Sequence, residues 1–152
     1  MATNEADTIT AQAATTIDAP AQDVWNVLTD PQRIGKYFMG ATVDTDWQVG
    51  HPITFTGEWK GQQYQDKGEI LACTPTSELA FSHWSPLAGT EDVPDNYHVV
   101  RITLVDRGDS TAVTLAQSNL NGAVTDDDRA HRADFEKNWA TVLDGLKADA
   151  EG

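Results

Sequence analysis

The sequence predicts an α+β domain in which an antiparallel sheet packs against a long C-terminal helix, with two short helices after the first strand. Three observations predict it: runs of alternating apolar and polar residues, consistent pairing between neighbouring runs, and a helical apolar stripe near the C-terminus. The 152 residues fit one domain. We expect the domain to span residues 8–148, with residues 1–7 and 149–152 frayed.

The N-terminal third predicts one strand and two short helices. A run over residues 8–17 is rich in Thr, Ala and Ile, as is typical of a strand. Pro20 supplies the φ of a first helical turn, and apolar residues at helical spacing predict a helix over residues 21–28. Pro31 ends that helix and can open a second one that runs through Tyr37.

The middle of the chain predicts a meander of antiparallel strands. The runs span residues 41–46, 53–60, 64–72, 79–83, 97–106 and 110–119. We expect Gly61-Gln62 to form the tight turn of the first hairpin, which places Phe55 opposite Gly68 and Trp59 opposite Tyr64. Pairing Leu104 with Val113 in the last hairpin also brings Ile102 opposite Leu115 and Val100 opposite Gln117. Both hairpins then match apolar face to apolar face, so we expect one sheet with a single buried face.

A long helix is predicted to close the chain. Thr125 is a good N-cap residue, and Asp128 stands three residues later, where a capping box has its second member. The negative charge of residues 126–128 suits the positive end of the helix dipole. Five apolar residues then share one face, and the helix is expected to run to about Ala148. These are Phe135, Trp139, Val142, Leu143 and Leu146.

Charge and composition exclude several classes of protein. The formal net charge is −14, which disfavours nucleic acid and anionic lipid surfaces as partners. The sequence has neither the length of apolar chain that membrane insertion needs nor the pattern of a secretory signal, so we expect a cytoplasmic protein. The one cysteine, Cys73, allows no internal disulfide and no structural zinc site by itself.

The order of elements resembles the helix-grip fold of the START/polyketide cyclase/Bet v 1-like (SRPBCC) superfamily, and within it the Hsp90-activator C-terminal-like (AHSA1-type) domains. The resemblance rests on Ile17-Asp18-Ala19-Pro20, Val24-Trp25, Leu28-Thr29-Asp30-Pro31, Trp47-x-x-Gly50, Gly68-x-Ile70 and Asn138-Trp139-x-x-x-Leu143-x-x-Leu146. It implies that a curved sheet wraps around the C-terminal helix. It also implies a cavity between the two layers, although the same inward residues could simply fill a core.

Alternation along the strands and helical spacing along the C-terminal helix predict which residues line such a cavity. They are Ile53, Phe55, Trp59, Tyr64, Asp66, Ile70, Phe81, His83, His98, Val100, Ile102, Leu115, Gln117, Asn119, Phe135, Trp139 and Leu143.

Five polar residues fall on the apolar side of the strands and toward one end of the sheet. They are Asp66, His83, His98, Gln117 and Asn119. They could orient the head group of a mostly apolar ligand, or they could lie at a solvent-exposed mouth. Asp66 with a histidine could also serve general acid–base catalysis, and two histidines with Asp66 could hold a metal ion.

We expect binding of a small hydrophobic molecule, lipid-like or aromatic, without chemistry and without a cofactor or metal. Two alternatives remain open from the sequence. One is an enzyme of the cyclase or hydrolase kind that uses Asp66, His83 and His98. The other is a protein-interaction module, as the resemblance to Hsp90 activators implies.

Overall fold

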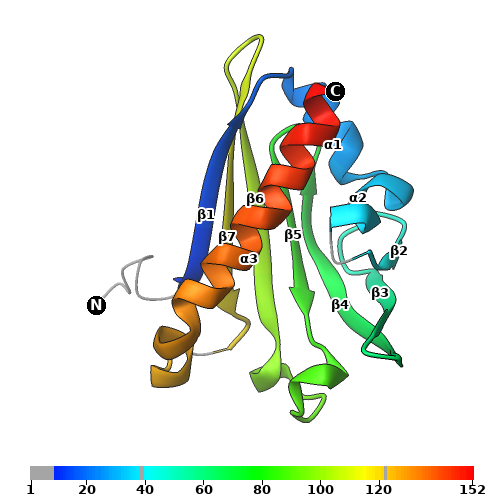
Figure 1. The fold of residues 1–152 in the computed structure, drawn as a ribbon, viewed down its shortest axis with the longest axis vertical. Coiled ribbons are helices and arrows are strands. Elements are labelled where there is room, and N and C mark those ends of the chain that lie inside the picture. Colours follow the sequence, from blue (N-terminus) through cyan, green and yellow to red (C-terminus); the bar gives the residue numbers. More distant parts are fainter. Residues whose placement is uncertain (1–8, 38–39, 122) are drawn as a thin grey trace.

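A computed structural model describes residues 9–37, 40–121 and 123–152, and it has the predicted α+β architecture (Figure 1). The elements are β1 (Ile9–Ile17), α1 (Ala21–Leu28), α2 (Pro31–Tyr37), β2 (Thr42–Asp44), β3 (Pro52–Trp59), β4 (Gln62–Thr74), β5 (Glu78–His83), η2 (Pro86–Ala88), η3 (Pro94–Asn96), β6 (His98–Asp106), β7 (Thr111–Asn119) and α3 (Asp126–Glu151).

The seven strands form one antiparallel sheet in the order β1-β7-β6-β5-β4-β3-β2. Strands β2 to β7 follow one another as a meander, and β1 pairs with the last of them. The short helices α1 and α2 carry the chain from one edge of the sheet to the other. Helix α3 lies lengthwise across one face of the sheet (Figure 1). The predicted helix-grip arrangement is therefore confirmed.

The register of the last hairpin is as predicted, and that of the first hairpin is not. Strands β6 and β7 pair Leu104 with Val113, Ile102 with Leu115 and Val100 with Gln117.

The first turn is formed by Lys60 and Gly61, both with positive φ, as in a type I′ turn. The prediction of a Gly61-Gln62 turn is therefore wrong. Phe55 pairs with Asp66 rather than Gly68, and Trp59 pairs with Gln62 rather than Tyr64. Because the error is two residues, every side chain keeps its predicted face.

A bulge in β4 changes which residues face inward near its end. The register shifts between Ile70 and Ala72, so that Ile70 opposes Phe81 while Cys73 opposes Leu79. Cys73 is partly buried and packs against the core. Strict alternation along the predicted strand 64–72 would place Ala72 on the same face as Ile70. That expectation is wrong, because the extra residue of a bulge reverses the alternation.

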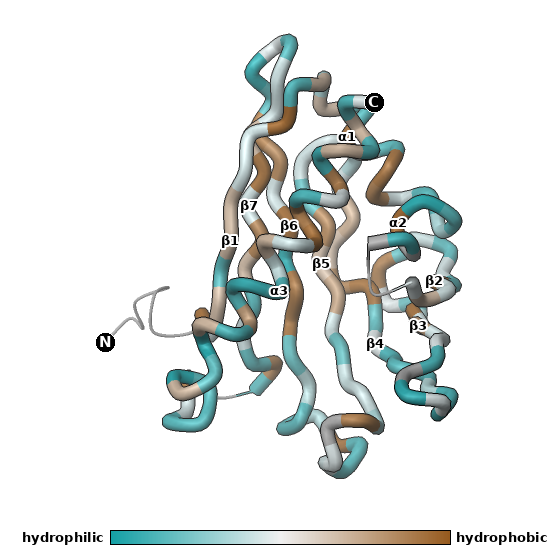
Figure 2. The backbone as a smooth tube through the Cα atoms, viewed as in Figure 1, coloured by the Kyte–Doolittle hydropathy of each residue, from teal (hydrophilic) through white to brown (hydrophobic). Residues whose placement is uncertain are grey.

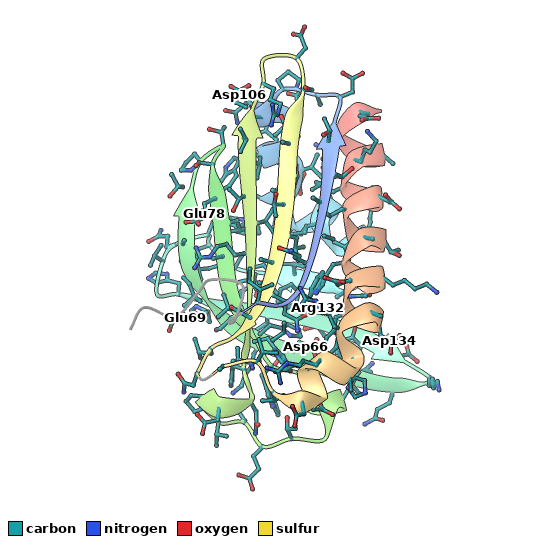
Figure 3. All side chains as sticks on the ribbon, turned by 90° about the vertical axis from the view of Figure 1, so that its left-hand side faces the viewer. Asp66, Glu69, Glu78, Asp106, Arg132 and Asp134 are labelled. Atoms are coloured by element: carbon teal, nitrogen blue, oxygen red, sulfur yellow. The ribbon has the colours of Figure 1, made fainter. Side chains whose placement is uncertain are left out.

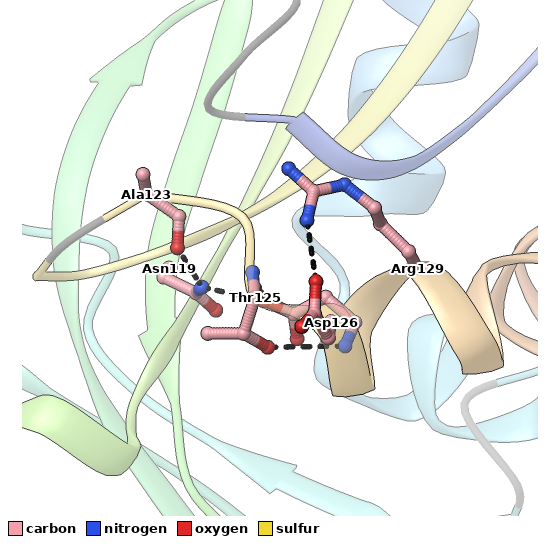
Figure 4. Close-up of polar contacts among 6 residues, drawn as sticks. Asn119, Ala123, Thr125, Asp126 and Arg129 are labelled. Atoms are coloured by element: carbon pink, nitrogen blue, oxygen red, sulfur yellow. Dashed lines mark hydrogen bonds and ion pairs between the residues drawn. The ribbon is translucent and has the colours of Figure 1, made fainter.

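The first turn of α3 has the predicted capping box. The Thr125 hydroxyl accepts a hydrogen bond from Asp128 N (3.1 Å), and the Asp128 carboxylate accepts one from Thr125 N (2.9 Å). Nearby, Arg129 pairs with Asp126 and the side-chain amide of Asn119 donates to the Ala123 carbonyl (Figure 4).

Helix α3 continues to Glu151, three residues beyond the predicted end. Whether residues 149–152 fray in solution stays a prediction.

The packed core lies toward the C-terminal half of α3. Leu143 and Leu146 of α3 meet Val24 and Leu28 of α1 and strand residues such as Ile102, and all five side chains are almost fully buried. Hydrophobic segments mark this part of the sheet, and the strands become more polar toward the opposite end (Figure 2). Among the described residues, no helix is long and apolar enough to cross a membrane.

Candidate functional site

A cavity of about 740 Å³ lies between the sheet and the N-terminal half of α3. The first residues of β6 and the last residues of β5 and β7 border it, together with the first half of β4. Protein interiors are normally close-packed. A cavity of this size is therefore unusual in a core. Its volume lies within the range of roughly 300–1,000 Å³ that is typical of small-molecule sites.

Most of the predicted lining residues border this cavity. They are Phe55, Tyr64, Asp66, Phe81, His83, His98, Val100, Gln117, Asn119, Phe135 and Trp139. The side chain of Trp59 lies outside the described residues. Five others do not border the cavity and are buried in the adjoining core. They are Ile53, Ile70, Ile102, Leu115 and Leu143.

The apolar wall combines aromatic rings from the sheet and from α3. The rings of Phe55 and Phe81 lie 5.5 Å apart between centroids, and Val100 continues this wall on β6. From the helix, Phe135 and Trp139 face the strands across the cavity. The Trp139 indole donates a hydrogen bond of 2.7 Å to Gln117 Oε1. This bond joins helix to sheet and gives a donor to the side-chain oxygen of a glutamine that is 4% exposed.

Asp66 and His83 form a hydrogen-bonded pair inside the cavity. His83 Nε2 lies 2.9 Å from Asp66 Oδ2, and the His83 ring packs edge-on against Phe55 at 5.6 Å. The second carboxylate oxygen, Asp66 Oδ1, is buried without a hydrogen-bond partner. Burial and the charge of Asp66 raise the pKa of Tyr64, so its phenol stays protonated near neutral pH.

A second polar chain links His98 to the start of α3. His98 Nδ1 lies 3.1 Å from Asn119 Oδ1, and the Asn119 amide donates to Asp128 Oδ2 at 2.9 Å. Burial lowers the pKa of His98, and the charge of Asp128 opposes that shift without cancelling it. Burial acts to raise the pKa of Asp128, but hydrogen bonds from Thr125 and Asn119 outweigh it and the net pKa is lowered. This chain therefore pairs a neutral imidazole with an ionised carboxylate at pH 7.

The loop between β5 and β6 supplies lining residues that the strand pattern does not reveal. Trp84, Ser85, Thr90, Asp95 and Asn96 border the cavity. The Trp84 ring stacks on Tyr97 at 6.3 Å, and its indole donates to Thr90 Oγ1. The length of this loop was the one feature of the sequence that could have indicated its role in the site. Loops of more than about 12 residues in a compact domain commonly have a function of their own.

The polar side chains of the cavity are arranged in hydrogen-bonded pairs and chains. In the described parts of the chain, no three His, Cys, Asp or Glu side chains are grouped so that they could hold a metal ion. The carboxylates, amides and imidazoles instead surround one end of an otherwise apolar chamber.

An antiparallel sheet that grips a long helix and leaves a chamber beside it defines a helix-grip domain of the SRPBCC type. Comparison with known proteins agrees. The chain belongs to the activator of Hsp90 ATPase homolog 1-like (AHSA1) family, whose model matches residues 18–151.

Solved structures show the same architecture. The solution structure of ChR145 from Cytophaga hutchinsonii is 45% identical, with a TM-score of 0.72 over 90% of each chain. The Aha1 dimer from Colwellia psychrerythraea is 17% identical, with a TM-score of 0.66 over 93% of this chain and 95% of that one. CalU16 from Micromonospora echinospora is 22% identical, with a TM-score of 0.64 over 91% and 74%. No protein of curated function matches the sequence.

Proposed function

We propose that the protein binds a small, mostly hydrophobic molecule in the cavity between the sheet and α3. The observation that carries the proposal is the cavity of about 740 Å³, walled by Phe55, Phe81, Val100 and Trp139 on the apolar side. Polar groups at one end could orient such a ligand, as in most small-molecule sites.

A neutral fluorescent probe tests this proposal directly. N-phenyl-1-naphthylamine brightens in apolar surroundings, so saturable enhancement with one site per chain is the expected result. Val100→Phe places extra volume in the cavity and should weaken binding at least ~tenfold, because overpacking a well-formed site forces its neighbours to move.

The matched control is Val105→Phe, on the same strand. Val105 is 50% exposed and does not border the cavity, so this variant should bind like the wild type. Equal binding by both variants, or no saturable binding by the wild type, would refute the proposal. Amide NMR shifts that cluster on Phe81, Val100 and Trp139 would locate the probe.

One observation favours a second candidate function, general acid–base catalysis. The Asp66–His83 pair borders the cavity with a 2.9 Å contact, and an imidazole oriented by a carboxylate is a suitable base. Turnover of a bound molecule that His83→Gln abolishes, with ligand affinity retained, would distinguish catalysis from binding alone.

The family description raises a co-chaperone role as another possibility. Such a role would place the partner on the outer surface of the domain. An NMR titration with Hsp90 would then perturb outward residues and leave Trp139 and Val100 unchanged.

A further inference from the structure

We infer that the cavity selects ligands by charge: it accepts a hydrophobic molecule whose polar end is a neutral hydrogen-bond donor or a cation, and it rejects an anionic one. This inference rests on the proposed function, because it names the chemical class of the ligand for the same cavity. A fatty acid and a long-chain amine of equal length would therefore bind very differently.

The first observation is the sign of the charges around the cavity. Four aspartates border it, namely Asp66, Asp95, Asp127 and Asp128. All ten Lys and Arg residues lie in the described part of the chain, and none of them is among the residues that border the cavity. An anionic head group would meet carboxylates without a permanently charged cation to offset them, and like charges placed together are costly in a partly desolvated site.

The second observation concerns Asp66, which pairs across β3 and β4 with Phe55 of the apolar wall. Its Oδ2 faces His83, while Oδ1 is buried and has no hydrogen-bond partner. Carboxylate oxygens only accept hydrogen bonds when ionised, and a buried acceptor without a donor is destabilising. Asp66 itself borders the cavity. A hydroxyl or ammonium group of a ligand would supply the missing donor.

The third observation concerns the groups that could attract an anion, namely the N-terminus of α3 and the two imidazoles. Each of them already faces a carboxylate or is uncharged. The N-terminal N–H groups of a helix attract anions, but at α3 the Thr125 hydroxyl accepts from Asp128 N, and the Asp128 carboxylate adds its own negative charge there. His83 faces Asp66, and burial lowers the pKa of His98. The ring of His98 therefore adds no positive charge near neutral pH.

A matched series of three probes tests the inference on the wild-type protein. Decan-1-ol, decylamine and decanoate share one chain length and carry, at pH 7, no charge, a positive charge and a negative charge. Their affinities are measured below micelle-forming concentrations from the shift of the Trp139 indole N–H signal, which lies at the cavity. We expect decylamine and decanol to bind at least ~tenfold more tightly than decanoate, in keeping with the cost of like charges in a binding site.

Two variants separate the site from the overall charge of the protein. Asp66→Asn should reduce the ratio of amine to decanoate affinity several-fold. Asp134→Asn makes the same change in net charge on the side of α3 that faces away from the sheet (Figure 3), where Asp134 is exposed, and should leave the ratio unchanged. The ratio should also persist at high salt, because salt screens the distant charges far more than those at a buried site.

The possible outcomes are distinguishable. If decanoate binds as tightly as decylamine at high salt, or if Asp134→Asn changes the ratio as much as Asp66→Asn does, the charge selection is refuted and cavity binding stands. If none of the three probes shifts the Trp139 signal while N-phenyl-1-naphthylamine still binds, the charge selection is refuted and cavity binding stands. If that probe also fails to bind, the proposed function itself falls, and this inference falls with it. The wild-type series decides the question even if Asp66→Asn fails to fold.

Discussion

Replacing Asp128 by alanine should be the most destabilising change in the first turn of α3. Asp128 is 7% exposed, and its Oδ2 accepts two hydrogen bonds of 2.9 Å, from Thr125 N and from Asn119 Nδ2. A hydrogen bond to a charged group contributes about 1.5–3 kcal/mol. Because Asn119 keeps its bond to the Ala123 carbonyl, we take the lower value for each bond and expect a loss of about 3 kcal/mol in the free energy of unfolding.

The assay is urea denaturation followed by tryptophan fluorescence, with thermal unfolding as a second measurement. A loss of about 3 kcal/mol corresponds to a fall in Tm of about 6–12 °C for a chain of this size. The control is Asp126→Ala in the same helical turn. Asp126 is fully exposed and forms one surface ion pair with Arg129, so its removal should change stability little.

The pH dependence provides an independent check of the same mechanism. The pKa of Asp128 is lower in the folded protein than its usual value. Its stabilising contribution is therefore complete above the unfolded pKa of about 4 and is lost as the pH falls through the folded pKa. The gap between wild type and Asp128→Ala should close as the pH falls through this window. An Asp128→Ala loss no larger than that of Asp126→Ala would refute the reasoning.

Two further predictions concern the sheet and the buried histidine. Gly68→Ala should cost about 3 kcal/mol or more in urea denaturation, because a Cβ there would lie 1.6 Å from the Ser82 carbonyl oxygen. Gly57→Ala, whose Cβ would meet only the Tyr64 side chain, should cost clearly less, and equal losses would contradict this explanation. Burial lowers the pKa of His98 in the folded state, so wild type should lose stability as the pH falls from about 6.5 through the folded pKa. His98→Gln should lack that loss, and parallel pH profiles for the two proteins would show that His98 is not responsible.

Along β6 and β7 the sequence was sufficient to predict which face of the strand is buried, but not which residues on that face line the cavity. Val100 and Ile102 share one face of β6, yet Val100 borders the cavity and Ile102 is in the core. Alternation along a strand reports the face alone. The boundary between cavity and core depends on where α1 meets α3, and that is a tertiary contact.

Local backbone features account for the other differences. The turn at Lys60 and Gly61 requires a positive φ at a lysine, which sequence preference does not favour, so a Gly-first turn was the more reasonable expectation. The bulge between Ile70 and Ala72 contains no glycine that would have indicated it in the sequence. Polar residues on the inward face of the strands did indicate the site correctly, since Asp66, His83 and His98 all border the cavity.

Helix α3 is held at both ends, and this determines how the molecule responds to compression. At its C-terminal end Arg33 pairs with Asp149 and Lys147 donates to the Thr16 carbonyl, while Asp128 fixes its first turn to Asn119. Hydrostatic pressure favours states of smaller volume. A helix anchored in this way would have to break these contacts to move closer to the strands. A tightly bound ligand that fills the chamber should therefore make the folded protein more resistant to pressure.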